Sequence, residues 1–169
     1  MVDENKDAVA MLKADHREVE ALFEAFEVAE SAGQKRALAE QICTALTVHA
    51  KLEEGIFYPA CRSTIENQDL VDEALVEHDG AKVLINEIEA GGPDEDFYDA
   101  KVKVLKEQIQ HHIEEEEKIR GNIFQQARAA DVDLEALGER MAERKAELMR
   151  MAETEGLPPA EPATMSSGA

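Results

Sequence analysis

A histidine followed four positions later by a glutamate occurs twice in this chain, at His49–Glu53 and at His112–Glu116. Residues four apart lie on the same face of an α-helix, so each pair would point an imidazole and a carboxylate in one direction. Two further histidines, His16 and His78, stand alone on other segments. Imidazole nitrogens and carboxylate oxygens suit iron or manganese better than a thiolate-rich structural zinc site. These six side chains are enough to hold two metal ions.

Hydrophobic side chains recur every three or four residues along most of the chain, the period of helices that bury one face. No run of alternating β-branched residues indicates a strand. Four long helices are predicted, over residues 9–26, 34–65, 70–90 and 95–130, with Pro59 kinking the second or ending it early. A fifth helix is predicted over residues 133–153, capped by Asp133 and docked on the other four.

Short connections between the first four helices favour an up-down-up-down bundle, in which neighbouring helices run antiparallel. That topology can be checked by counting residues from the turns. His16 lies 17 residues before the turn at Gly33, and His49 lies 16 residues after it. Similar counts around the next two turns bring all six groups within about two helical turns of one level. We therefore predict an all-α four-helix bundle with one polar layer inside it.

Each histidine alone has an ordinary explanation as a core side chain bonded to a neighbour. The joint pattern differs, because burying four imidazoles and two carboxylates without a cation would be very costly. Of the double histidine, His112 continues the apolar stripe of its helix, whereas His111 lies on a more polar stripe with Glu115. His111 is therefore expected to flank the site. Other acidic residues beside the predicted ligands are expected on the solvated surface: Glu54, Glu114 and Glu117.

The 169-residue chain carries 38 acidic and 18 basic residues, a formal net charge of −20. Such a field repels nucleic acid and anionic lipid, so neither is expected as a partner. Cys43 and Cys61 fall on one predicted helix, roughly 27 Å apart, which is too far for a disulfide. Free thiols fit a reducing compartment, and no signal peptide or membrane span is visible. The protein is expected to be cytoplasmic.

The length suggests a single domain with a proper core. The expected organisation is a bundle over residues 8–130, a C-terminal helix over 131–153 and a tail over 154–169. The tail is rich in small residues and proline, so we expect it to be disordered.

Four ordered sequence motifs resemble those of the hemerythrin-like HHE cation-binding family. Within residues 8–130 they are Asp15-His16, His49-x-x-x-Glu53-Glu54 followed by Ile56-Phe57-Tyr58-Pro59, Glu77-His78-Asp79, and His111-His112-Ile113-Glu114-Glu115-Glu116-Glu117. The resemblance implies a four-helix bundle around a non-heme centre of two iron ions with an oxo or hydroxo bridge. The ligands it implies are His16, His49, Glu53, His78, His112 and Glu116.

Two features depart from the family pattern. The oxygen carriers of the wider family have a second histidine on the third helix, four residues from the first, where this chain has Ala74 and Lys82. The Phe-Pro that follows the last ligand motif in the family is absent from residues 118–124. The resemblance therefore indicates a metal centre more strongly than it indicates reversible oxygen carriage.

The leading hypothesis is a protein that binds or reacts with O2, NO or peroxide at a di-iron centre, in sensing, scavenging or iron handling. The alternative is a di-iron enzyme that consumes peroxide or activates oxygen. A third interpretation has no metal, and the acidic bundle or its fifth helix contacts a protein partner. Tyr58, one turn beyond the first motif, either packs in the core or points toward the site. No motif identifies a particular substrate or protein partner.

Overall fold

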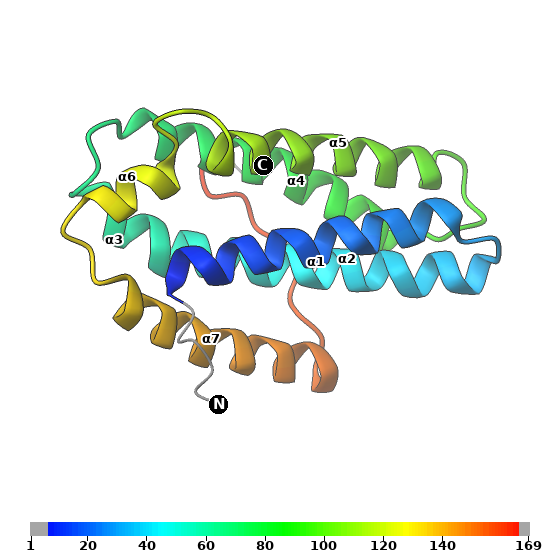
Figure 1. Cartoon of the computed structure of the whole chain (residues 1–169). Coiled ribbons are helices and arrows are strands. Elements are labelled where there is room, and N and C mark those ends of the chain that lie inside the picture. The colour runs from blue at the N-terminus through cyan, green and yellow to red at the C-terminus, as the bar shows by residue number, and fades with distance from the viewer. Residues whose placement is uncertain (1–6, 166–169) are drawn as a thin grey trace.

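The computed structural model describes residues 7–165, and this part of the chain contains helices and no strand. The helical elements are α1 (Ala8–Val28), α2 (Ala32–Leu52), η1 (Glu53–Phe57), α3 (Tyr58–Arg62), α4 (Asp69–Ala90), α5 (Tyr98–Glu117), α6 (Ile123–Ala129) and α7 (Leu134–Thr154). The long helices α1, α2, α4 and α5 form the bundle, and α7 lies outside it against α1 and α2 (Figure 1). The predicted all-α four-helix bundle is confirmed. No described helix has the length and apolar composition needed to cross a membrane.

The ends of several helices are set by local hydrogen bonds. Asp7 caps α1 by accepting a bond from the backbone N–H of Ala10 at 2.9 Å. Ser31 and Gln34 form a reciprocal capping box at the start of α2, which closes the short turn after α1. Asp133 caps α7 as predicted, with its carboxylate 3.0 Å from the N–H of Ala136. The capping box allows the short connection between α1 and α2, and short connections keep neighbouring helices antiparallel.

The predicted second helix, residues 34–65, is divided into three pieces in the structure. A π-helical turn, η1, occupies Glu53–Phe57 between α2 and α3. Its wider ring appears in the bond from the Tyr58 N–H to the Glu53 carbonyl, five residues back. Pro59 follows at once and has no N–H to donate, so an ordinary α-helical ladder cannot pass through it. The interruption expected at Pro59 therefore begins six residues earlier, at a predicted metal ligand.

The predicted fourth helix, residues 95–130, was wrong in its extent. It forms two helices, because α5 ends at Glu117 and α6 begins at Ile123. Gly121, in the connection between these two helices, has φ +76°, a left-handed conformation that suits glycine. The side chain of Asn122 then caps α6 at the N–H of Gln125, at 2.9 Å. Ile119 lies on this connection and is 51% exposed.

The C-terminal tail also differs from its expected disorder. Residues 157–165 run from α7 across the bundle to α4 (Figure 1). The carboxylate of Asp79 and the amide of Asn86, both on α4, hydrogen-bond to the tail, mainly through backbone groups. Such contacts need no hydrophobic tail side chains, which explains why composition did not predict them. Residues 166–169, also part of the expected disordered tail, lie outside the described residues.

The bundle has two apolar clusters with a polar layer between them. On α1, Leu12 belongs to one cluster and Val19 to the other, with His16 between them. On α5, Leu105 and Ile109 belong to the second cluster, and His112 follows them. The apolar clusters shield the layer from above and below, so its charges depend on groups within the layer.

Candidate metal centre

All six side chains predicted as ligands meet in the polar layer, and each is buried. They divide into two groups of three, in which the potential donor atoms lie within 4.8 Å of one another. The groups are His16, His49 and Glu116, and Glu53, His78 and His112. Each group combines two imidazoles from different helices with one carboxylate. The counting argument from the turns therefore placed these residues at the correct level.

The four imidazoles are arranged as two facing pairs. The Nε2 atoms of His16 and His49 are 3.1 Å apart, and those of His78 and His112 are 3.2 Å apart. All four Nε2 atoms point to the inside of the layer, and all four Nδ1 atoms point to its outside. A donor set that converges on two points in this way can hold two cations.

The two glutamates lie between the pairs. Glu53 Oε1 is 2.9 Å from His49 Nε2 and 3.3 Å from His78 Nε2. Glu116 places Oε2 3.4 Å from His16 Nε2 and Oε1 3.2 Å from His112 Nε2. Each carboxylate thus touches an imidazole of both groups, the position from which it could bridge two ions.

A ring of four further carboxylates surrounds the imidazoles. Each accepts from, or lies within bonding distance of, one outward-facing Nδ1 atom. The pairs are Asp15 with His49 at 3.1 Å, Glu54 with His78 at 3.2 Å, Glu77 with His112 at 3.4 Å, and Glu117 with His16 at 2.9 Å. An ionised carboxylate can only accept, so each Nδ1 carries the hydrogen and the Nε2 of a neutral ring has a free lone pair. In this tautomer all four histidines could act as metal ligands through Nε2.

The carboxylates of this ring connect each bundle helix to a neighbouring one. Every outer carboxylate is adjacent in sequence to one predicted ligand and bonds the histidine of a neighbouring helix. Asp15, beside His16 on α1, reaches α2, and Glu54, beside Glu53, reaches α4. Glu77 of α4 then reaches α5, and Glu117 of α5 returns to α1. The four bundle helices are thus tied together at the level of the site.

Basic side chains hold three of these carboxylates from outside. Lys145 of α7 lies 2.6 Å from Asp15, and Arg17 lies 2.8 Å from Glu117. Lys82 lies 2.8 Å from Glu54. In the resemblance, Lys82 stands where oxygen carriers have another histidine; here its ammonium group positions the partner of His78. The contact from Lys145 also gives α7 a role in the site, because it orients Asp15 and through it His49.

The predicted surface positions of Glu54 and Glu117 were wrong. Both side chains are largely buried, because their partners lie on neighbouring helices. Their adjacency to Glu53 and Glu116 was the available signal. His111 does flank the site, with 65% of its side chain exposed and Nε2 3.1 Å from Glu115.

Tyr58 points toward the site, one of the two positions that its sequence allowed. Its buried hydroxyl donates to Glu116 Oε1 at 2.5 Å and lies 3.4 Å from His78 Nε2. Burial raises the pKa of the phenol well above its usual value, and the charges of Glu116 and Glu53 raise it further. Tyr58 therefore keeps its proton and acts as a hydrogen-bond donor beside both groups.

The electrostatics of the layer favour a cation. Burial by itself would raise the pKa of the Glu53 carboxyl, but His49 and the other imidazoles hold it well below its usual value. Burial would lower the pKa of His49, yet the charges of Glu53 and Asp15 raise it to about 10. Both oxygens of Glu53 and Oε2 of Glu116 are buried without a hydrogen-bond partner. Unpartnered buried carboxylate oxygens beside imidazoles fit the requirements of bound metal ions.

The outer ring leads to a test on Asp15. Replacement by Asn keeps the shape of the side chain but removes the charge that Lys145 and His49 share. We expect metal affinity to fall about tenfold or more, the usual cost of losing a partner of a ligating histidine. Competition with a chelator of known affinity measures it. Glu18→Gln, an exposed change on the same helix, is the control, and equal affinities of the two variants would contradict the role given to Asp15.

Fold and site together define a helical bundle with buried His/Glu groups that could hold cations between its helices. The pattern of the hemerythrin HHE cation binding domain matches residues 7–124, and the chain belongs to that family. A solved HHE cation binding domain-containing protein from Mycobacterium kansasii has a similar fold, with a TM-score of 0.72 and 23% identity. The likeness covers 89% of this chain and 94% of that one.

A second relative is a DNA nickase from Nostoc sp. (strain PCC 7120 / SAG 25.82 / UTEX 2576). It is 28% identical over 107 residues, which are 63% of this chain. The match spans only 30% of the length of that relative. The similarity therefore concerns one part of a much longer protein.

Proposed function

We propose that this protein holds a non-heme centre of two iron ions that binds or reacts with O2, NO or peroxide. The ligands are the six buried side chains of the polar layer: His16, His49, Glu53, His78, His112 and Glu116. The observation that carries the proposal is the matched geometry of the layer, in which four Nε2 atoms converge while every Nδ1 atom is bonded to a carboxylate. Nitrogen and oxygen donors without thiolate favour iron over structural zinc.

Iron bound at such a site would supply open coordination positions and redox chemistry to a small ligand. The residues of this chain supply the rest. Glu53 and Glu116 would hold the ions together with the imidazoles, and the outer carboxylates keep the imidazoles in one orientation. The apolar clusters above and below lower the local dielectric constant, which strengthens the electrostatic interactions inside the layer. Tyr58 offers a hydroxyl proton next to Glu116 and His78.

Binding of NO tests the function directly. The reduced, iron-loaded protein should give a saturable change in its visible spectrum when NO is added under anaerobic conditions, because small ligands bind at open positions on the metal. The zinc-loaded protein serves as the control and should give no such change. An iron-loaded protein whose spectrum does not respond to NO, O2 or peroxide would exclude the proposed activity while leaving a metal site in place.

The alternative is an enzyme that consumes peroxide or activates oxygen at the same centre. The position of Tyr58 supports this alternative, because its buried hydroxyl could donate a hydrogen bond to a ligand bound at the centre. Steady turnover of hydrogen peroxide, retained after loosely bound iron is removed and lowered in Tyr58→Phe, would establish the enzyme. Binding without turnover would favour sensing, scavenging or iron handling.

We propose a reducing cytoplasmic location, since Cys43 and Cys61 are both buried free thiols. We do not extend DNA nicking to this chain. Its net charge of −20 opposes the approach of a phosphate backbone, so neither nucleic acid nor an anionic membrane is a proposed partner.

A further inference from the structure

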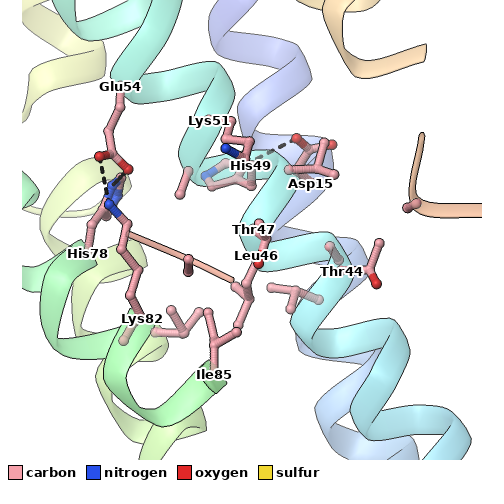
Figure 2. A pocket seen from close by; sticks show the side chains of 18 of the residues that line it. Asp15, Thr44, Leu46, Thr47, His49, Lys51, Glu54, His78, Lys82 and Ile85 are labelled. Atoms are coloured by element: carbon pink, nitrogen blue, oxygen red, sulfur yellow. Dashed lines mark hydrogen bonds and ion pairs between the residues drawn. The ribbon is translucent and has the colours of Figure 1, made fainter. Parts of the chain in front are cut away.

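A cavity of about 1040 Å³ lies beside the metal centre, between α2 and α4 and beneath the C-terminal tail. Figure 2 shows His78, Glu54 and Lys82 on one side of it and His49, Thr47 and Leu46 on the other. His112 also lines the cavity, which therefore reaches imidazoles of both ligand groups. A molecule bound in this cavity would lie against the centre.

The cavity is far larger than a diatomic ligand requires. A water-sized molecule takes up roughly 30 Å³, whereas pockets for organic ligands measure about 300–1,000 Å³. The volume therefore indicates space for an organic molecule in addition to any ligand on the metal.

The walls of the cavity are suited to a neutral molecule. The charged side chains closest to the histidines are paired with each other, Glu54 with Lys82 at 2.8 Å and Asp15 with Lys145 at 2.6 Å. Acidic side chains outnumber basic ones among the remaining charged lining residues, so the lining does not favour an anion. Much of the interior is aliphatic, formed by Val19, Leu22, Leu46, Ile85, Ile109 and Ile113.

The tail forms one wall of the cavity and is held in place by hydrogen bonds to Asp79. Residues 158–163 line the cavity. The carboxylate of Asp79 accepts bonds from the backbone N–H groups of Ala163, Thr164 and Met165, at 2.7, 2.7 and 3.0 Å. The hydroxyl of Thr164 adds a fourth bond at 2.6 Å. These bonds fix a segment of small and proline residues over an otherwise open groove.

We propose that this cavity binds a neutral, mainly apolar organic molecule, covered on one side by the tail and placed against the metal centre. The inference adds a second class of ligand to the proposed function. The inference depends on the proposed function only in one respect, namely that the metal beside the bound molecule is iron. The hydroxyl of Thr47, at the cavity wall, offers a hydrogen bond to a polar group on the molecule.

Calorimetric titration of the full metal-loaded chain with 2-(1-naphthyl)ethanol, a neutral aromatic alcohol, tests the inference. We expect saturable binding of one molecule per chain. Ala81→Phe places a ring into the cavity from α4 and should weaken binding about tenfold or more, because the added volume displaces the probe. The matched control is Val83→Phe on the same helix, where the side chain is 57% exposed and the affinity should stay unchanged.

A second variant ends the chain after Leu157 and removes the tail that covers the cavity. Its affinity should also fall about tenfold, because one wall is lost; it decides the question if Ala81→Phe does not fold. Absence of saturable binding to the intact chain, or equal affinity in the intact and shortened chains, would overturn the inference. Metal content is measured in the same samples, so a protein that binds the probe but contains no iron would contradict only the proposed function.

Discussion

Replacing His49 and Glu53 together by alanine is expected to remove at least half of the bound metal. His49 belongs to one ligand group, and Glu53 belongs to the other while contacting both. The double change therefore deprives each group of one of its three side chains, and the remaining donors are too few for tight binding. Elemental analysis of purified wild-type and variant proteins measures the loss.

The chain contains its own control for this experiment. His111 and Glu115 have the same four-residue spacing on α5, one position before His112 and Glu116, but face outward. Alanine at both positions should lower the metal content far less than the double change at His49 and Glu53, because His111 and Glu115 lie outside the buried layer and approach it only through Glu77. If His49→Ala, Glu53→Ala lost less than half of its metal, or no more than the His111→Ala, Glu115→Ala control, the assignment of the ligands would be wrong.

Removal of the metal is expected to destabilise the whole bundle. Without a cation, the unpartnered oxygens of Glu53 and Glu116 remain buried among four imidazoles. A ligand present at a thousand times its dissociation constant stabilises the folded state by about 4 kcal/mol per site. For two sites in a chain of this size that corresponds to a fall in Tm of roughly 15–30 °C on complete removal.

Thermal unfolding before and after chelation measures this effect. The chelator should change the Tm of the His49→Ala, Glu53→Ala variant much less, since that variant has little metal to lose. A wild-type Tm that stays unchanged after its metal has demonstrably been removed would support the interpretation without a structural metal, in which the acidic bundle serves as an interaction module.

The level of the site could be predicted because helices have a constant rise and the first four are joined by short turns. Counting from Gly33 was sufficient to place His16 beside His49. The stripe on α5 likewise distinguished His112 from His111, since only the former continues the buried positions Leu105 and Ile109. Both arguments use only the helical rise and the spacing of residues along one helix, which can be taken directly from the sequence.

The ring of outer carboxylates could not be predicted from helical periodicity. Glu54 and Glu117 looked like surface residues because each lies off the apolar stripe of its own helix. Their burial comes from contacts to His78 and His16 on neighbouring helices, which no local pattern encodes. The sequence does show an acidic residue next to each of these ligands. Whether that acid reaches a histidine of the neighbouring helix depends on how the two helices are rotated relative to each other, which the sequence does not give.

Backbone features account for the other differences. Pro59 predicts that the helix is interrupted. The form of the interruption, a π-helical turn at Glu53–Phe57, depends on packing in the folded core and is not visible in the sequence. The tail was expected to be disordered because it has few apolar side chains that could be buried in the core. The backbone N–H groups that bind it to Asp79 are present whatever its side chains are, so the composition of the tail does not reveal them.

Elemental analysis of the purified full chain, combined with its ultraviolet-visible spectrum before and after reduction, tests the central claim most directly. The proposal predicts about two iron atoms per chain and ligand-to-metal charge-transfer absorption that disappears on reduction. One atom or none per chain, or a colourless oxidised protein that contains zinc in place of iron, would contradict the di-iron centre.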